Sequence, residues 1–149
     1  MGKDLSTLKN NSIIIENKTN FRIPDELFYP VLKVVFEEEK ISKDKTVGIV
    51  LTTDEIIRKY NKKYLGRDSI TDVMSFQVDD PGLPYLGDIM IDIEVAEKQK
   101  GNKNLNEELQ ILFLHGLLHL LGYDHISVAQ KKIMEIKEKK YWKKIKGEK

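Results

Sequence analysis

The alternation of hydrophobic and polar positions predicts four short strands in which β-branched residues are frequent. These strands cover residues 12–16, 46–51, 71–78 and 87–93. In the third strand Val73, Ser75 and Gln77 share one face, whereas Met74 and Phe76 share the other. Only a short, turn-rich link separates the third strand from the fourth, so we expect these two strands to pair antiparallel.

Apolar positions that recur every three or four residues predict five helices. These helices cover residues 24–40, 53–65, 94–100, 105–121 and 127–145. Pro30 would interrupt the first helix unless it lies in the first turn. The fourth helix is apolar on almost every side and is expected to run through the core, while Ile133, Ile136, Tyr141 and Ile145 form the apolar face of the last. Without repeats or linkers, residues 1–149 are expected to form one domain.

All three histidines of the chain lie within residues 114–125, at the end of the most apolar predicted helix. His115 and His119 are four residues apart, a spacing that places both imidazoles on one helical face, one turn apart. Gly122 can end the helix in a conformation that other residues avoid, so that the chain turns and His125 returns to the same point. This pattern indicates a metal ion held by three imidazoles with a fourth position open.

A single buried histidine is usually a core residue with a hydrogen-bond partner. Here the same interpretation would have to account for three histidines in one short segment. Two unpaired imidazoles among leucines would each cost on the order of 1–3 kcal/mol. Imidazoles without thiolates suit zinc best, and three protein ligands are typical of catalytic zinc, which lowers the pKa of a bound water towards about 7. A structural zinc site would instead need a fourth ligand, for which Asp124 and Asp88 are candidates.

Composition narrows the class of protein. The 149 residues include no cysteine, which excludes a disulfide framework, a thiolate metal site and a thiol nucleophile. The first residues lack the apolar run of a signal peptide, and the longest apolar stretch is too short to span a bilayer. We therefore expect a cytoplasmic protein.

Charge is segregated although the net value is only +1. Five positive residues without an intervening acid are Arg58, Lys59, Lys62, Lys63 and Arg67. The segment 131–149 holds nine lysines against three glutamates. Such surfaces suit a nucleic acid, although a solvated helix face explains the C-terminal lysines equally well.

The spacing H-x3-H-x2-G-x2-H is typical of metzincin peptidases, but one residue of their motif is missing. These enzymes carry glutamate directly after the first histidine as the general base. This chain carries Gly116, which has no proton acceptor. Met134 is a candidate counterpart of their methionine turn, although a methionine in an amphipathic helix is more often core. A zinc metallopeptidase is therefore an alternative function, but the general base that it requires is missing from the motif.

Three motifs together resemble the YbeY family of bacterial endoribonucleases. Residues 114–125 read LHGLLHLLGYDH like the family signature, residues 71–76 read TDVMSF where the family has TDVLSF, and residues 86–89 read LGDI. Asn61 and Tyr64 precede these motifs in the same order. The resemblance covers roughly residues 45–137, and its histidine motif is highly specific.

The resemblance implies an α+β fold in which about five helices, including a zincin-like metal helix, pack a small mixed four-stranded sheet. It implies one Zn²⁺ ion held by His115, His119 and His125. It also implies cleavage of single-stranded RNA, chiefly at the 3′ end of small-subunit ribosomal RNA, and a part in ribosome quality control. The implied partners are therefore the ribosomal small subunit and its assembly factors. A non-catalytic, zinc-stabilised assembly factor is a further alternative.

The residues that assist the metal are less well defined. Leu65 stands where the family commonly has a functional arginine, so either Arg67, two residues further on, replaces it or the position is dispensable. Asp124 could orient an imidazole, serve as the base or cap its own loop. Tyr60 and Tyr64 could stack on bases, although Tyr60 is more readily explained as a core residue.

Overall fold

The structure is a computed structural model that describes residues 12–65, 72–78, 80, 82–124 and 126–147. The described strands form one four-stranded sheet in the order β1–β2–β4–β3. These strands are β1 (Ile13–Asn17), β2 (Thr46–Thr52), β3 (Val73–Gln77) and β4 (Tyr85–Asp92). β2 pairs parallel with both β1 and β4, and β3 pairs antiparallel with β4. The four predicted strands and the predicted antiparallel pair are confirmed.

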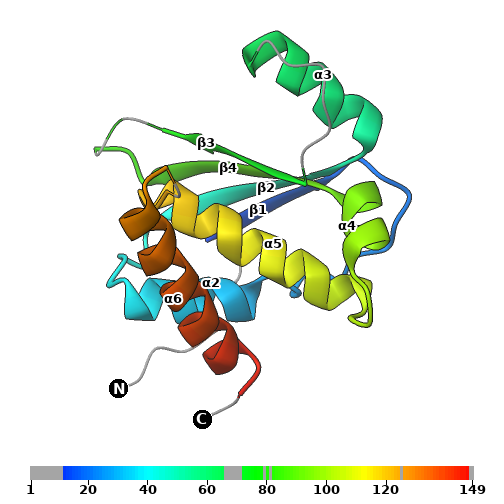
Figure 1. The fold of residues 1–149 in the computed structure, drawn as a ribbon. Coiled ribbons are helices and arrows are strands. Elements are labelled where there is room, and N and C mark those ends of the chain that lie inside the picture. Colours follow the sequence, from blue (N-terminus) through cyan, green and yellow to red (C-terminus); the bar gives the residue numbers. More distant parts are fainter. Residues whose placement is uncertain (1–11, 66–71, 79, 81, 125, 148–149) are drawn as a thin grey trace.

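The described part of the chain contains five helices, which lie on both sides of the sheet. They are α2 (Tyr29–Glu38), α3 (Asp54–Leu65), α4 (Ile93–Gln99), α5 (Leu105–Leu120) and α6 (Val128–Ile145). Helices α2, α5 and α6 gather against one face, and α3 lies over the other (Figure 1). This arrangement confirms the expected α+β fold. No helix in the described ranges is long and apolar enough to cross a membrane.

The main core lies between the sheet and helices α2, α5 and α6. Ile49 of β2 and Ile89 of β4 point into it and are almost fully buried. From the helices, Phe28 meets Phe113 edge to face, with ring centroids 5.2 Å apart. Each fully buried aliphatic side chain of this kind contributes about 1.5–3 kcal/mol relative to an exposed one. Because α5 is buried around most of its circumference, it is the rigid element on which a site can be built.

Two details of the predicted helices are wrong. Helix α2 begins at Tyr29 rather than at residue 24, because Pro30 lacks a backbone N–H and fits only within the first turn. In α6 half of the predicted apolar face is wrong: Tyr141 is buried and Ile145 packs against the core, but Ile133 and Ile136 are 49% and 57% exposed, and Met134 is buried with Tyr141 instead. The buried pair is seven residues apart, two helical turns, and forms the stripe that faces the rest of the protein.

Polar contacts with α2 explain how α6 is oriented. Glu39, directly after α2, accepts hydrogen bonds from the hydroxyl groups of Tyr123 and Tyr141 and from Nζ of Lys137. Burial alone would raise the pKa of Glu39, but these hydrogen bonds lower it. Glu38 pairs with Lys144 at 2.6 Å. Several lysines of the basic C-terminal segment therefore bind glutamates of this chain, which favours the solvated-face interpretation over an RNA-binding one for those residues.

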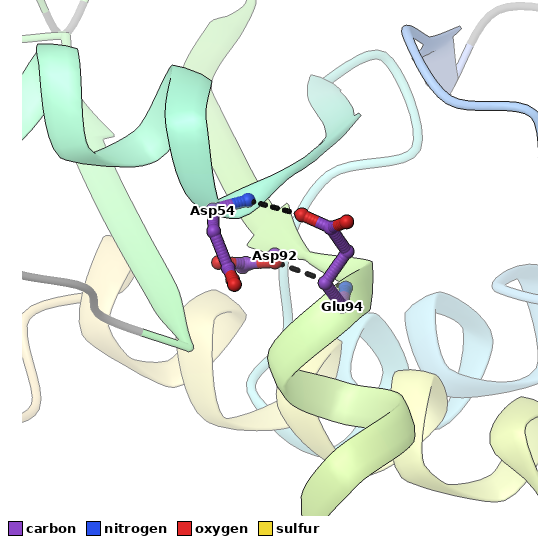
Figure 2. A group of neighbouring side chains, drawn as sticks. All are labelled: Asp54, Asp92 and Glu94. Carbon is purple, nitrogen blue, oxygen red and sulfur yellow. Dashed lines mark hydrogen bonds between the residues drawn. The ribbon is translucent and has the colours of Figure 1, made fainter.

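A cluster of carboxyl groups lies where β4 ends and helices α3 and α4 begin (Figure 2). Asp92 is the N-cap of α4, and its Oδ1 accepts hydrogen bonds from the backbone N–H groups of Glu94 and Val95. The backbone N–H of Asp54 donates to Oε1 of Glu94 at 2.7 Å. The cluster thereby joins the first turns of two helices to the end of a central strand.

Stability is expected to fall as the pH rises through the range in which Asp92 ionises. Burial, and after it the hydrogen bond with Asp54, raises the pKa of Asp92 to about 7, whereas that hydrogen bond lowers the pKa of Asp54. Between about pH 4 and pH 7 the folded chain therefore keeps a proton that the unfolded chain has lost, so the free energy of unfolding decreases. In Asp92→Asn this decrease, on the order of 2 kcal/mol, is expected to disappear.

Urea unfolding of both proteins between about pH 5 and pH 8 measures this difference. Asparagine is a good N-cap, so the substitution keeps the start of α4. Glu97→Gln, within the same helix, is the matched control and should follow the wild-type pH dependence. Parallel curves for wild type and Asp92→Asn would contradict the prediction.

Candidate metal centre

His115 and His119 lie on one face of α5, as their spacing predicts. Their Nε2 atoms are 3.2 Å apart, and their ring centroids are separated by 4.7 Å. Both side chains are half-buried in the apolar C-terminal part of α5. Two ring nitrogens thus converge on one point that solvent can reach.

The separation of the two Nε2 atoms fits a shared metal ion. With zinc–nitrogen distances of about 2.0–2.1 Å, two ligands of a tetrahedral ion lie about 3.3 Å apart. The observed distance of 3.2 Å agrees with this value. His125, the third predicted ligand, lies outside the described residues.

Glu138 of α6 holds the imidazole of His115 from the side opposite to Nε2. Its Oε2 lies 3.0 Å from Nδ1 of His115, and both side chains are partly buried. The hydrogen bond with this carboxylate raises the pKa of His115. A carboxylate on Nδ1 leaves Nε2 as the metal-binding nitrogen and fixes the ring orientation, as in many zinc sites. Sequence analysis missed this residue, because 23 positions separate it from His115.

Two side chains of β3 position α5 against the sheet. Oγ of Ser75 donates to the carbonyl oxygen of Gly116 at 3.0 Å. Nε2 of Gln77 donates to the carbonyl oxygen of Leu120 at 2.9 Å, which lies in the last turn where helical carbonyls lack partners. Each of these carbonyls belongs to the residue that follows a histidine. The sequence pattern placed Ser75 and Gln77 on one face but did not reveal this contact.

Gly116 lies where α5 approaches the sheet most closely. A Cβ atom there would lie 2.7 Å from Cγ2 of Ile89 and 3.2 Å from Cγ2 of Val73. Contacts this short would force the core to shift, and a glutamate would place a buried charge as well. Position 116 therefore cannot hold the general base of a metzincin peptidase without rearrangement.

The turn after α5 has the geometry that Gly122 predicts. Gly122 has φ of +104°, and its N–H donates to the carbonyl of His119. The N–H of Tyr123 donates to the carbonyl of Leu118, which completes a Schellman motif. Because Tyr123 also binds Glu39, the turn is tied to α2.

Asp124 caps this loop. Its Oδ1 accepts a hydrogen bond from the backbone N–H of Ile126 at 3.0 Å. Of the three roles expected for Asp124, loop capping is the one that this hydrogen bond supports. Its role as an orienting group or as a base stays a prediction.

Asp88 does not lie beside the histidines. It pairs with Phe76 in the sheet and accepts a hydrogen bond from the hydroxyl of Tyr85, on the face that carries Met90 and α3. The histidines lie on α5, which packs on the opposite face (Figure 1). Asp88 is therefore excluded as a fourth ligand of the histidine site.

Four residues of the basic segment, Arg58, Lys59, Lys62 and Lys63, lie on the exposed side of α3. Tyr60 points inwards and packs against Phe76, with ring centroids 6.2 Å apart, which supports the core interpretation of this tyrosine. Arg58 and Lys59 are exposed. Arg67 and the side chains of Tyr64 and Leu65 lie outside the described residues, so the position of the replacement arginine stays a prediction.

This chain is similar to known proteins that share one description. A family model described as "Endoribonuclease YbeY" matches residues 12–146. A protein of Nautilia profundicola with that description is 46% identical over 85 residues, 55% of this chain and 60% of that protein. One from Desulforamulus reducens is 37% identical over 123 residues, 76% of this chain and 80% of that protein. The solution structure of a Thermotoga maritima protein matches with a TM-score of 0.63 and 27% identity, over 91% of this chain and 89% of that chain.

Proposed function

Since this chain belongs to the YbeY family of endoribonucleases, we propose that it cuts single-stranded RNA at a metal centre formed by His115, His119 and His125. As a member of this family the chain is a hydrolase whose substrate is RNA. The convergence of two Nε2 atoms, 3.2 Å apart, is the observation that carries the proposal of a metal centre. The proposed substrate is the 3′ end of small-subunit ribosomal RNA, in maturation and ribosome quality control.

We propose zinc as the ion, because neutral imidazoles without thiolates suit it best. When bound, zinc would act as a Lewis acid on the phosphate and increase the acidity of water. The chain's own contribution is to keep the ring nitrogens in place. Glu138 holds His115 through Nδ1, and Ser75 and Gln77 hold the helix that carries both histidines.

Cleavage of a phosphodiester also requires positive groups near the phosphoryl oxygens, where charge increases in the transition state. We propose Arg67 for this role, with Arg58 and Lys59 of α3 binding the RNA backbone further away. We propose Asp124 as the proton acceptor, because its carboxylate is oriented by the N–H of Ile126 and it precedes His125 in the chain.

The two alternative functions have less support. A peptidase of the metzincin type needs a glutamate at position 116, where a side chain would collide with Ile89. A non-catalytic assembly factor does not agree with membership of an endoribonuclease family. As part of the proposal, the protein acts in the cytoplasm as a single domain, together with the ribosomal small subunit and its assembly factors.

A chelator experiment tests the proposed function. Purified protein is expected to cut a single-stranded RNA oligonucleotide, to lose this activity after treatment with a chelator and to regain it when Zn²⁺ is added. The loss should reach about a thousandfold, which corresponds to several kcal/mol of transition-state stabilisation. The same RNA in duplex form and casein serve as control substrates, and neither should be cut. Cleavage that persists at full rate in chelator would disprove the metal mechanism.

A further inference from the structure

The carboxylates of Asp54, Asp92 and Glu94 form a group with no role in the proposed reaction. They come from the first residue of α3, the last residue of β4 and the first turn of α4. The carboxyl groups of Asp54 and Asp92 lie together, and that of Glu94 lies against the backbone N–H of Asp54 (Figure 2). One oxygen atom from each lies within 4.8 Å of the others. All three come from ends of regular elements, so their positions are well defined.

The hydrogen bonds of the group leave specific oxygen atoms without donors. Oδ1 of Asp92 accepts two backbone N–H groups, and Oε1 of Glu94 accepts the N–H of Asp54. Once Asp92 ionises and the proton that it shares with Asp54 is lost, Oδ2 of Asp92 and Oδ1 of Asp54 are buried without a hydrogen-bond donor. Asp92 is 0% exposed. A buried carboxylate oxygen without a donor costs several kcal/mol unless a cation or a proton compensates it.

The neighbouring positive charges compensate the three carboxylates only weakly. Nζ of Lys98 lies 3.5 Å from Oδ2 of Asp54, but its side chain is 74% exposed, so solvent screens the pair. The charge of Arg58, one turn further along α3, also lowers the pKa of Asp54, but less than that of Lys98 does. The three carboxylates, when ionised, therefore keep an excess of negative charge between them.

We propose that Asp54, Asp92 and Glu94 bind a hard divalent cation, with Ca²⁺ as the best fit. An all-oxygen set of carboxylates is typical of Ca²⁺ and Mg²⁺ and unlike the imidazoles on α5. Ligand atoms spread over up to 4.8 Å suit Ca²⁺–oxygen distances of about 2.3–2.6 Å better than the shorter distances of Mg²⁺. Oδ2 of Asp92 and Oδ1 of Asp54 supply the ligand atoms that now lack a donor.

The cation would fix α3 relative to α4 and β4. Helix α3 carries the exposed basic residues proposed to bind RNA, and it packs over its sheet face through a small core of Ile57, Met74 and Met90. A bound ion at the first residue of α3 would therefore stabilise the orientation of the basic surface without taking part in cleavage.

Calorimetric titration of the metal-free protein with CaCl₂ at about pH 8 tests this site, because both aspartates are then expected to be ionised. Wild type should bind one Ca²⁺, and at about ten times the dissociation constant its unfolding midpoint should rise by about 2–6 °C. Asp92→Asn should lose both effects, and Glu94→Gln should weaken them. Glu55→Gln, next to the group on α3 but exposed, should behave as wild type.

His119→Ala is the second control, because it separates the two sites. This variant should keep the Ca²⁺ response if the carboxylates are the ligands. The proposal is overturned if wild type gives neither heat nor a shift at about 10 mM Ca²⁺, or if Asp92→Asn responds as wild type does. It is also overturned if the response depends on His119.

Discussion

The substitution His119→Ala is expected to reduce cleavage of single-stranded RNA about a thousandfold or more and to lower the zinc content well below one ion per chain. His119 supplies one of the two Nε2 atoms that lie 3.2 Å apart, so its removal leaves an incomplete ligand set. The loss of a metal that contributes several kcal/mol of transition-state stabilisation corresponds to this change in rate. A cleavage assay together with metal analysis of the purified variant measures both effects.

Asn106→Ala is a matched control, because Asn106 is exposed on the same helix, nine residues before His115. It should retain both zinc and activity. Circular dichroism of the histidine variant should show the helix content of wild type, since His119 is only half-buried and its removal opens no core cavity. A variant that keeps zinc but loses activity would disprove the ligand role of His119, although not its involvement in catalysis.

Glu138→Ala is expected to weaken zinc binding about 10- to 100-fold and to lower RNA cleavage at limiting zinc. The carboxylate lies 3.0 Å from Nδ1 of His115 and fixes both the ring and its tautomer. Without it the imidazole can rotate and present either nitrogen. Competition with a chromophoric chelator measures the affinity, and saturating zinc should restore most of the activity.

Two further variants define what Glu138 does. Glu138→Gln keeps an oxygen atom that can accept the hydrogen bond from Nδ1, so it should retain most of the affinity if orientation is the main effect. Glu135→Ala, exposed on the same helix, removes the same charge without touching His115 and should behave as wild type. If Glu135→Ala weakens zinc binding as much as Glu138→Ala does, general charge rather than orientation is responsible.

Gly116 shows how one small residue separates this protein from the peptidases with the same histidine spacing. The spacing alone is shared, and the missing glutamate can be read from the sequence. The structure adds the reason: α5 packs so closely on β3 and β4 that a Cβ atom at position 116 would meet Ile89 and Val73. The hydrogen bond from Ser75 to the carbonyl of Gly116 depends on this close approach. The proposed general base must therefore come from another part of the chain.

Most elements could be predicted because their signals are local. Period-two and helical patterns located all four strands and five helices in the described part of the chain. The predicted start of α2 is too early, because the first turn of this helix, which accommodates Pro30, has no strong hydrophobic pattern. Ile133 and Ile136 are wrongly predicted to be buried, because the orientation of α6 depends on Glu38 at the end of α2 and on Glu39 directly after it, which the pattern of α6 does not contain.

The sequence by itself determined the arrangement of His115, His119 and Gly122, since helix geometry and backbone sterics act over a few residues. Only the tertiary structure decided which groups surround them. In the folded protein Glu138 contacts His115, and Ser75 and Gln77 bind backbone carbonyls of α5. Asp88 lies on the face of the sheet opposite to the one on which the histidine helix packs. The tertiary structure also buried Asp92 beside Asp54, two residues that lie 38 positions apart in the chain. These contacts join residues far apart in the chain, so they depend on how whole elements pack rather than on any local pattern.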